Sequence, residues 1–118
     1  MLEKDIEARV CKHAQKYGVL TRKYTSPSHR SVPDRLFLFP TGLAVFIEFK
    51  QKGAKPTKGQ RREMQKLVDL QHLVYVIDDI DDGCKLVDSL IEIISRDRPE
   101  TLTGAAMALI KQKFKKQC

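Results

Sequence analysis

LAVFIEFK, residues 43–50, has the composition of an interior strand that ends in charge. Six of its eight residues are apolar, but Glu48 and Lys50 stand two positions apart at its end. Removing water from an unpaired charge costs several kcal/mol or more, so two charges in a buried strand need partners. Because alternate residues of a strand point to the same side, Glu48 and Lys50 share a face. The stretch therefore predicts a core strand with a polar site at its end.

The segment before this strand predicts a β-hairpin. RLFLF, residues 35–39, is strand-like and too apolar for an exposed strand. PTG, residues 40–42, fits a three-residue turn in which Gly42 supplies the positive φ that such turns often need. Phe39 then faces Leu43, and facing residues of an antiparallel pair keep a constant sum of residue numbers. A bulge at the turn would shift this register by one residue.

In this register Asp34 lies opposite Glu48, on the same side of the sheet as Lys50. Two carboxylates about 5 Å apart repel each other, and a divalent cation with oxygen ligands would neutralise them. Lys50 would lower the repulsion further and could hold or polarise a metal-bound water. Glu7 or Glu3 from the first helix could complete the set. The alternative is that these charges simply reach solvent, where a Glu–Lys pair contributes little.

The rest of the chain predicts a small α/β sandwich. The element order is helix, three strands, helix, strand and two helices, which describes a mixed sheet with helices on both faces. Thr57 is expected to cap the second helix, and DDIDDG, residues 78–83, is expected to be an acidic turn. No repeat or linker divides the 118 residues, so we expect one domain. Helices are expected at 2–17, 57–71, 84–94 and 101–116, and strands at 19–25, 35–39, 43–50 and 73–77.

The charge of the chain indicates a polyanionic partner. Lys and Arg number 22 against 15 Asp and Glu, for a net charge of +7, and nucleic acid is the usual partner of such a domain. Positive charge gathers in KQKGAKPTKGQRR (50–62) and in the tail KQKFKKQ (111–117). A solvated turn and a solvated helix end are the alternative interpretations of these two segments.

Other features exclude several classes of protein. Three cysteines without a CxxC spacing argue against a disulfide framework or a zinc site and suit a reducing cytosol. No apolar run approaches the ~18 residues of a membrane span, and the charged start MLEKDIEARV is unlike a secretory signal. We expect a cytoplasmic protein with no membrane contact and no small-molecule cofactor.

PDR at 33–35 followed by EFK at 48–50 resembles the PD-(D/E)xK nuclease motif. With EKDIE, SPSHRSVPDR, IEFKQKGAKPTKGQ and VYVID, the chain more narrowly resembles the virus-type replication-repair nuclease family, VRR-NUC, over about residues 3–90. The resemblance implies a restriction-endonuclease-like fold with an αβββαβ core plus C-terminal helices. We expect residues 1–98 to form the VRR-NUC nuclease domain. Residues 99–118 would then form a basic C-terminal helix available for dimerisation or DNA contact.

The resemblance also implies an endonuclease that cuts DNA phosphodiesters with Mg²⁺ or Mn²⁺. The family pattern assigns two metal-binding carboxylates, a backbone carbonyl ligand, a catalytic lysine, a first-helix glutamate that is catalytic or metal-binding, and a glutamine. In this chain Asp34 and Glu48 would be the metal-binding carboxylates, and the backbone carbonyl of Phe49 would be the further ligand. Lys50 would be the catalytic lysine. Glu7 or Glu3 would be the first-helix glutamate, and Gln60 the glutamine. Glu7 has the spacing of archaeal Holliday-junction resolvases and Glu3 fits the N-terminal family signature, so both remain candidates.

Basic residues near this end of the sheet and in the segment 50–62 would contact DNA phosphates. They are His29, Arg30, Arg35, Lys52, Lys55 and Lys58. Stand-alone members of this size resemble homodimeric Holliday-junction resolvases. We therefore expect a structure-specific endodeoxyribonuclease, encoded by a phage or prophage, that acts on four-way junctions as a homodimer. The alternatives are a restriction-type or flap nuclease and a non-catalytic DNA-binding accessory protein.

Overall fold

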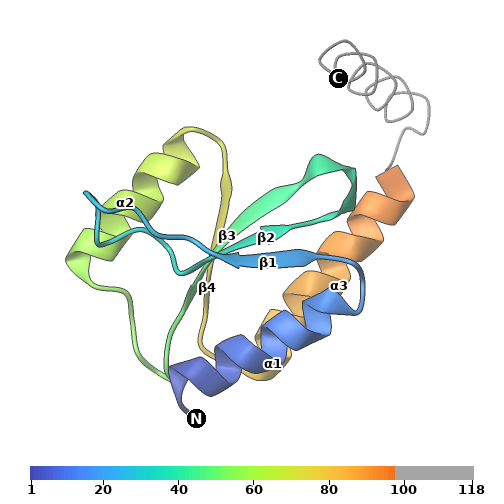
Figure 1. Cartoon of the computed structure of the whole chain (residues 1–118), viewed down its shortest axis with the longest axis horizontal. Helices are drawn as coiled ribbons and strands as arrows, with labels where there is room; N and C mark the ends of the chain where they lie inside the picture. Colours follow the sequence, from blue (N-terminus) through green and yellow to red (C-terminus); the bar gives the residue numbers. More distant parts are fainter. Residues whose placement is uncertain (98–118) are drawn as a thin grey trace, which may run out of the picture.

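The strand LAVFIEFK lies inside a four-stranded sheet in the computed structural model of the protein, which describes residues 1–97. The strands are β1 (Leu20–Lys23), β2 (Arg35–Leu38), β3 (Ala44–Phe49) and β4 (Leu73–Ile77). They lie side by side in chain order (Figure 1). β2 runs antiparallel to β1 and β3, whereas β4 runs parallel to β3. The predicted mixed sheet is confirmed.

The hairpin of β2 and β3 has the predicted register. The facing pairs are Arg35–Ile47, Leu36–Phe46, Phe37–Val45 and Leu38–Ala44. Each pair has the same sum of residue numbers as Phe39 and Leu43, so no bulge shifts the ladder. Continued by one pair beyond Arg35–Ile47, the register sets Asp34 opposite Glu48.

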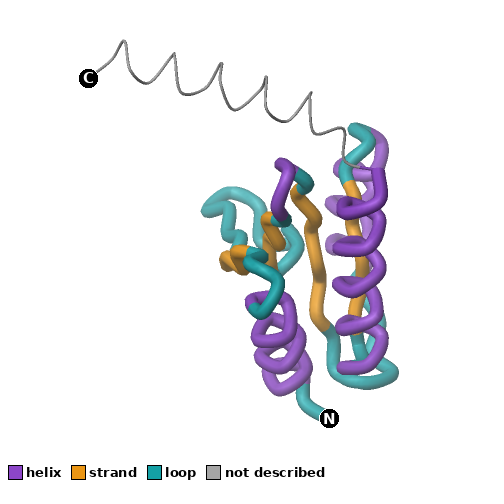
Figure 2. The backbone as a smooth tube through the Cα atoms, turned by 90° about the vertical axis from the view of Figure 1, so that its right-hand side faces the viewer, coloured by secondary structure: helices purple, strands orange, loops and turns teal. Residues whose placement is uncertain are grey.

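The turn of this hairpin is a short 3-10 helix, η1 (Pro40–Gly42). It is closed by the N–H of Phe39, which donates to the carbonyl of Leu43 at 2.8 Å. Gly42 has the expected positive φ, 88°, and Thr41 has a positive φ of 73° that the sequence does not predict. Figure 2 shows this turn at the opposite end of the molecule from the N-terminus.

Within residues 1–97, three helices cover the two faces of the sheet, which confirms the predicted arrangement. They are α1 (Glu3–Gln15), α2 (Lys58–Asp69) and α3 (Ile80–Asp97). α1 and α3 contact each other on one face, and α2 lies on the other face beside β4 (Figure 1). Thr57 caps α2, because its side chain accepts the N–H of Gln60 at 3.1 Å.

The acidic turn expected at 78–83 is wrong, because α3 already begins at Ile80. The Asp79 carboxylate accepts the N–H of Asp82 at 3.1 Å. Negative charge is favourable at a helix N-terminus, where N–H groups lack partners inside the helix. The acidic run therefore starts the helix instead of separating it from β4.

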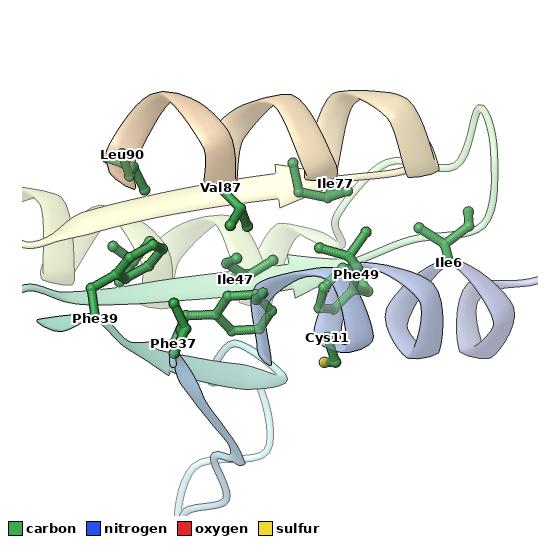
Figure 3. Close-up of a cluster of buried hydrophobic side chains, with 13 residues drawn as sticks. Ile6, Cys11, Phe37, Phe39, Ile47, Phe49, Ile77, Val87 and Leu90 are labelled. Atoms are coloured by element: carbon green, nitrogen blue, oxygen red, sulfur yellow. The ribbon is translucent and has the colours of Figure 1, made fainter. Parts of the chain in front are cut away.

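The core lies between the sheet and the helices α1 and α3, as Figure 3 shows. Along β3, Val45, Ile47 and Phe49 are buried on this side, so the alternating residues Phe46 and Glu48 point to the face of α2. Burying such apolar side chains contributes about 1.5–3 kcal/mol each, which fixes the end of β3. The buried apolar residues of this core are Ile6, Val10, Cys11, Ala14, Val19, Phe37, Phe39, Val45, Ile47, Phe49, Ile77, Val87 and Leu90.

The expected helix at 101–116, and with it the role expected for residues 99–118, lies outside the described residues. Within residues 1–97, no helix has the length and apolar character that crossing a membrane requires.

Candidate active site

Asp34 and Glu48 meet where β2 begins and β3 ends. The N–H of Phe49 donates to Asp34 Oδ2 at 3.0 Å, so the end of β3 itself orients the Asp34 carboxylate. Lys50, two residues after Glu48, brings its Nζ to 3.4 Å from Glu48 Oε2. The hairpin and strand alternation thus bring together the three charged groups that the sequence predicts.

Glu48 is almost fully buried, with 1% of its surface exposed. Its Oε2 accepts a hydrogen bond from Gln60 Nε2 at 3.0 Å, but its Oε1 is buried without a partner among the described residues. Leaving a buried acceptor unsatisfied costs about 1–3 kcal/mol, and more for a charged group. A bound cation would satisfy this oxygen, so the carboxylate suits a hard divalent metal.

Gln60 uses both ends of its side-chain amide. Its Oε1 accepts the N–H of Thr57 at 2.9 Å, which completes a capping box at the start of α2. Its Nε2 then points toward the sheet and donates to Glu48. One side chain therefore joins the N-terminus of α2 to the buried carboxylate.

Burial dominates the electrostatics of the two carboxylates. Burial, and after it the negative charge of Asp34, raise the pKa of Glu48 to about 7, while Lys50 opposes the shift. Burial also raises the pKa of Asp34, although the hydrogen bond from the N–H of Phe49 acts to lower it. In such surroundings the charged form is unfavourable unless a cation is near. Metal binding to Glu48 would therefore compete with protons near neutral pH.

Both candidate glutamates of the first helix reach this end of the sheet. Glu7 Oε1 accepts from Arg35 Nε at 3.2 Å, and both side chains are 18% exposed. Glu3 is exposed, and its pKa is raised by partial burial and by the charge of Asp34. Together with Gln51, the two glutamates line one open hollow. Glu7 is thus held by Arg35, whereas Glu3 faces solvent beside Asp34.

Within residues 1–97, no three side chains of His, Cys, Asp or Glu converge closely enough to form a complete metal cage. The pair of Asp34 and Glu48 could supply only part of a coordination shell. This suits Mg²⁺, which usually keeps several waters and binds proteins through one or two carboxylates.

The basic residues expected to contact DNA occupy different surroundings. Arg35 is engaged with Glu7, and Lys52 Nζ pairs with Asp79 Oδ1 at 3.1 Å. His29 Nδ1 lies 3.2 Å from Ser26 Oγ within its own loop. The exposed ones are His29, Arg30, Lys52, Lys55 and Lys58.

Sequence reasoning missed how other segments frame the site. A Cβ on Gly59 would lie 2.8 Å from Ser31 Oγ, so the start of α2 packs closely on the loop that carries Arg30. Asp78 and Asp79 hold the loop after Lys50. The sequence does hold a signal for the position of Asp78 and Asp79. Both residues follow β4 directly, and the end of β4 lies beside the end of the parallel strand β3.

Comparisons with known proteins bear on the family and the fold of the chain. No family model matches the chain. A protein of Acyrthosiphon pisum secondary endosymbiont phage 1, named "Putative nuclease p44", is 42% identical over 79 residues, which cover 67% of this chain and 85% of that protein. A solved "VRR_NUC domain" is 28% identical with a TM-score of 0.65, over 76% of this chain and 94% of that one. A "VRR_NUC domain protein" at 15% identity and a TM-score of 0.64, over 79% and 90% of the two chains, shares the fold.

Proposed function

Because the chain belongs to the VRR-NUC family of nucleases, we propose that it is a metal-dependent endodeoxyribonuclease that hydrolyses DNA phosphodiester bonds. The observation that carries the proposal is the buried Asp34–Glu48 pair with Lys50 beside it. A buried carboxylate with one unpartnered oxygen is costly in a purely structural role. It is well suited to holding a cation next to a phosphate.

The cation would be Mg²⁺ or Mn²⁺, held by Asp34 and Glu48 with the backbone carbonyl of Phe49 as a further ligand. Either Glu7 or Glu3 would act beside the pair through a metal-bound water, since neither converges with Asp34 and Glu48 into a set of three direct ligands. When bound, the ion would supply Lewis acidity and an activated water for attack on phosphorus. The raised pKa of Glu48 means that this carboxylate must lose its proton before it can serve as a ligand.

The chain's own residues would bind and orient the DNA. The Lys50 ammonium would donate hydrogen bonds to a non-bridging phosphate oxygen and stabilise the charge that develops there. Gln60 would hold Glu48 Oε2 and keep the other oxygen of that carboxylate directed at the site. The exposed cations Arg30, Lys55 and Lys58 would contact phosphates, which gives affinity that falls with salt and reads no bases. Lys52 would also contact a phosphate once its ion pair with Asp79 is broken.

We propose further that the substrate is branched DNA, with a four-way Holliday junction as the first candidate. A four-way junction has two-fold symmetry, and its resolution needs two strands cut at related positions. One chain holds one Asp34–Glu48 pair within residues 1–97. A symmetric homodimer would present two such sites.

The test is cleavage of labelled four-way junction, flap and linear duplex with Mg²⁺, with Mn²⁺ and with chelator. We expect metal-dependent cuts, most rapid in the junction, that are abolished by Asp34→Asn, Glu48→Gln and Lys50→Ala. All three variants should still bind DNA. Full activity in any variant, or activity in chelator, would overturn the assignment. Preference for flap or linear duplex would identify a flap or restriction-type nuclease, and binding without cleavage by the intact chain would identify an accessory protein.

A further inference from the structure

We propose that Asp78 is a positioning residue of this site: its carboxylate anchors the basic loop, residues 50–57, and through that loop it fixes Lys50. The observation is a hydrogen bond in which the N–H of Gly53 donates to Asp78 Oδ2 at 3.0 Å. The positioning role rests on the proposed nuclease function, whereas the anchoring of the loop does not.

The basic loop is attached to the end of β4 at successive points. The N–H of Lys50 donates to the carbonyl of Ile77 at 2.8 Å, which continues the parallel pairing one residue beyond β3. Gly53 then binds Asp78. Between these two points the chain turns sharply. The N–H of Ala54 donates to the backbone carbonyl of Gln51 at 2.9 Å, and Gly53 has a φ of 83°. Anchors on residues 50 and 53 therefore bracket the segment that starts with Lys50.

Lys50 depends on these anchors because it stands at the boundary between sheet and loop. Its side chain is only 13% exposed and its Nζ lies 3.4 Å from Glu48, so a small backbone shift would change the distance between ammonium and carboxylate. Beyond Lys50 the basic loop is exposed except for Pro56. Few apolar contacts restrain such a segment, so specific hydrogen bonds decide its order.

The charge of Asp78 makes the anchoring role testable. A carboxylate under a basic loop weakens the attraction of that loop for a polyanion, so its removal should strengthen DNA binding if charge is its main effect. Asp78→Ala removes both the charge and the acceptor oxygen. Asp78→Asn removes the charge but keeps an oxygen that can accept the N–H of Gly53. The two variants therefore separate the charge from the hydrogen bond.

Asp81 provides a matched control. It lines the same hollow as Asp78 and is exposed, and within residues 1–97 no hydrogen bond joins its side chain to the basic loop. Asp81→Asn and Asp81→Ala change the charge by the same amount in the same region. We expect both to leave kcat unchanged.

The first measurement is steady-state cleavage of the best DNA substrate. We expect Asp78→Ala to lower kcat about 10-fold or more, since small displacements of a catalytic group are costly, without raising KM. Asp78→Asn should retain most of kcat and bind DNA at least as tightly as the wild type. Wild-type kcat in Asp78→Ala, or an equal loss of kcat in both variants, would overturn the proposal.

The second measurement is limited trypsin digestion of the metal-free, DNA-free chain, which does not depend on activity. Cleavage after Lys52 should be several-fold faster in Asp78→Ala than in the wild type, and near the wild-type rate in Asp78→Asn and the Asp81 variants. Equal rates in all variants would overturn the anchoring role even if the wild type cuts no DNA. Failure of the nuclease function alone would instead appear as an inactive wild type with the expected digestion pattern.

Discussion

At the scale of single residues, Glu48 combines near-complete burial with an unpartnered oxygen and a pKa raised to about 7. An unfolded glutamate has a pKa near 4.5. Between these values the native state holds more protons than the unfolded state, so the free energy of unfolding falls as pH rises. The stabilising effect of the protonated form is complete below about pH 4.5 and is lost as pH passes 7. The metal-free fold thus bears a cost that the bound cation would remove.

This cost predicts that Glu48→Gln stabilises the metal-free protein while abolishing cleavage. At pH 8 the variant should be more stable than the wild type by about 1–3 kcal/mol, because a neutral amide replaces a buried charge. The difference should shrink toward pH 5. Urea denaturation in chelator at both pH values measures it, and the exposed control Glu92→Gln should show no such change. A less stable variant at pH 8 would contradict the electrostatic account.

The double use of Gln60 leads to a second prediction at this scale. Gln60→Glu keeps an oxygen for the capping box at Thr57 but replaces the donor to Glu48 with a repelling carboxylate. Thr57→Ala removes the cap and leaves the Glu48 contact, at about 1 kcal/mol of stability. We expect Gln60→Glu to lose most cleavage and Thr57→Ala to lose mainly stability, measured by cleavage rate and thermal unfolding. The opposite ranking would assign Gln60 to the cap alone.

At the scale of elements, the packing of α1 against α3 depends on a close approach at Gly83. A Cβ at this position would lie 2.5 Å from Val10 Cγ2 and 3.1 Å from Ile77 Cγ2. Gly83→Ala should therefore destabilise the fold by about 1–3 kcal/mol, although alanine is the better helix former. The double variant Gly83→Ala with Val10→Ala should lose less than the sum of the two single variants. Additive losses in urea denaturation would show that no steric contact couples the helices.

The elements also explain how far the sequence predicts this protein. Hydrophobic alternation and a three-residue turn suffice for the register that sets Asp34 against Glu48, because a one-residue slip would expose Val45 and Ile47. The sequence does not predict the start of α3, because DDIDDG has the composition of a turn and only the Asp79 cap shows that it opens a helix. The ion pair of Glu7 with Arg35 and the orphan oxygen of Glu48 depend on side-chain packing between distant elements. No local pattern encodes such contacts.

At the scale of the whole molecule, positive charge lies in exposed loops around the candidate site. The exposed cations Arg30, Lys55 and Lys58 flank the packed contact between Ser31 and Gly59. Each phosphate contact should steepen the fall of DNA affinity with salt, so Lys55→Ala and Lys58→Ala should each reduce the slope of log K against log salt by about 1. The exposed control Lys12→Ala, on α1, should leave the slope unchanged. In binding titrations between 50 and 200 mM salt, a wild-type slope in Lys55→Ala and Lys58→Ala would show that these residues do not meet DNA.

The proposed resolvase requires two sites in one particle, which predicts both a mass and a pattern of cuts. A chain of 13.5 kDa should sediment as a dimer of twice that mass, 27.0 kDa, at micromolar concentration. Heterodimers of one wild-type and one tagged Lys50→Ala subunit should nick a four-way junction in one strand only, since each strand would be cut by its own subunit. Wild-type homodimers should cut two opposed strands and release linear duplexes. A monomeric mass, or two-strand cutting by the purified heterodimer, would contradict the dimer and leave a nuclease whose single site acts on one strand at a time.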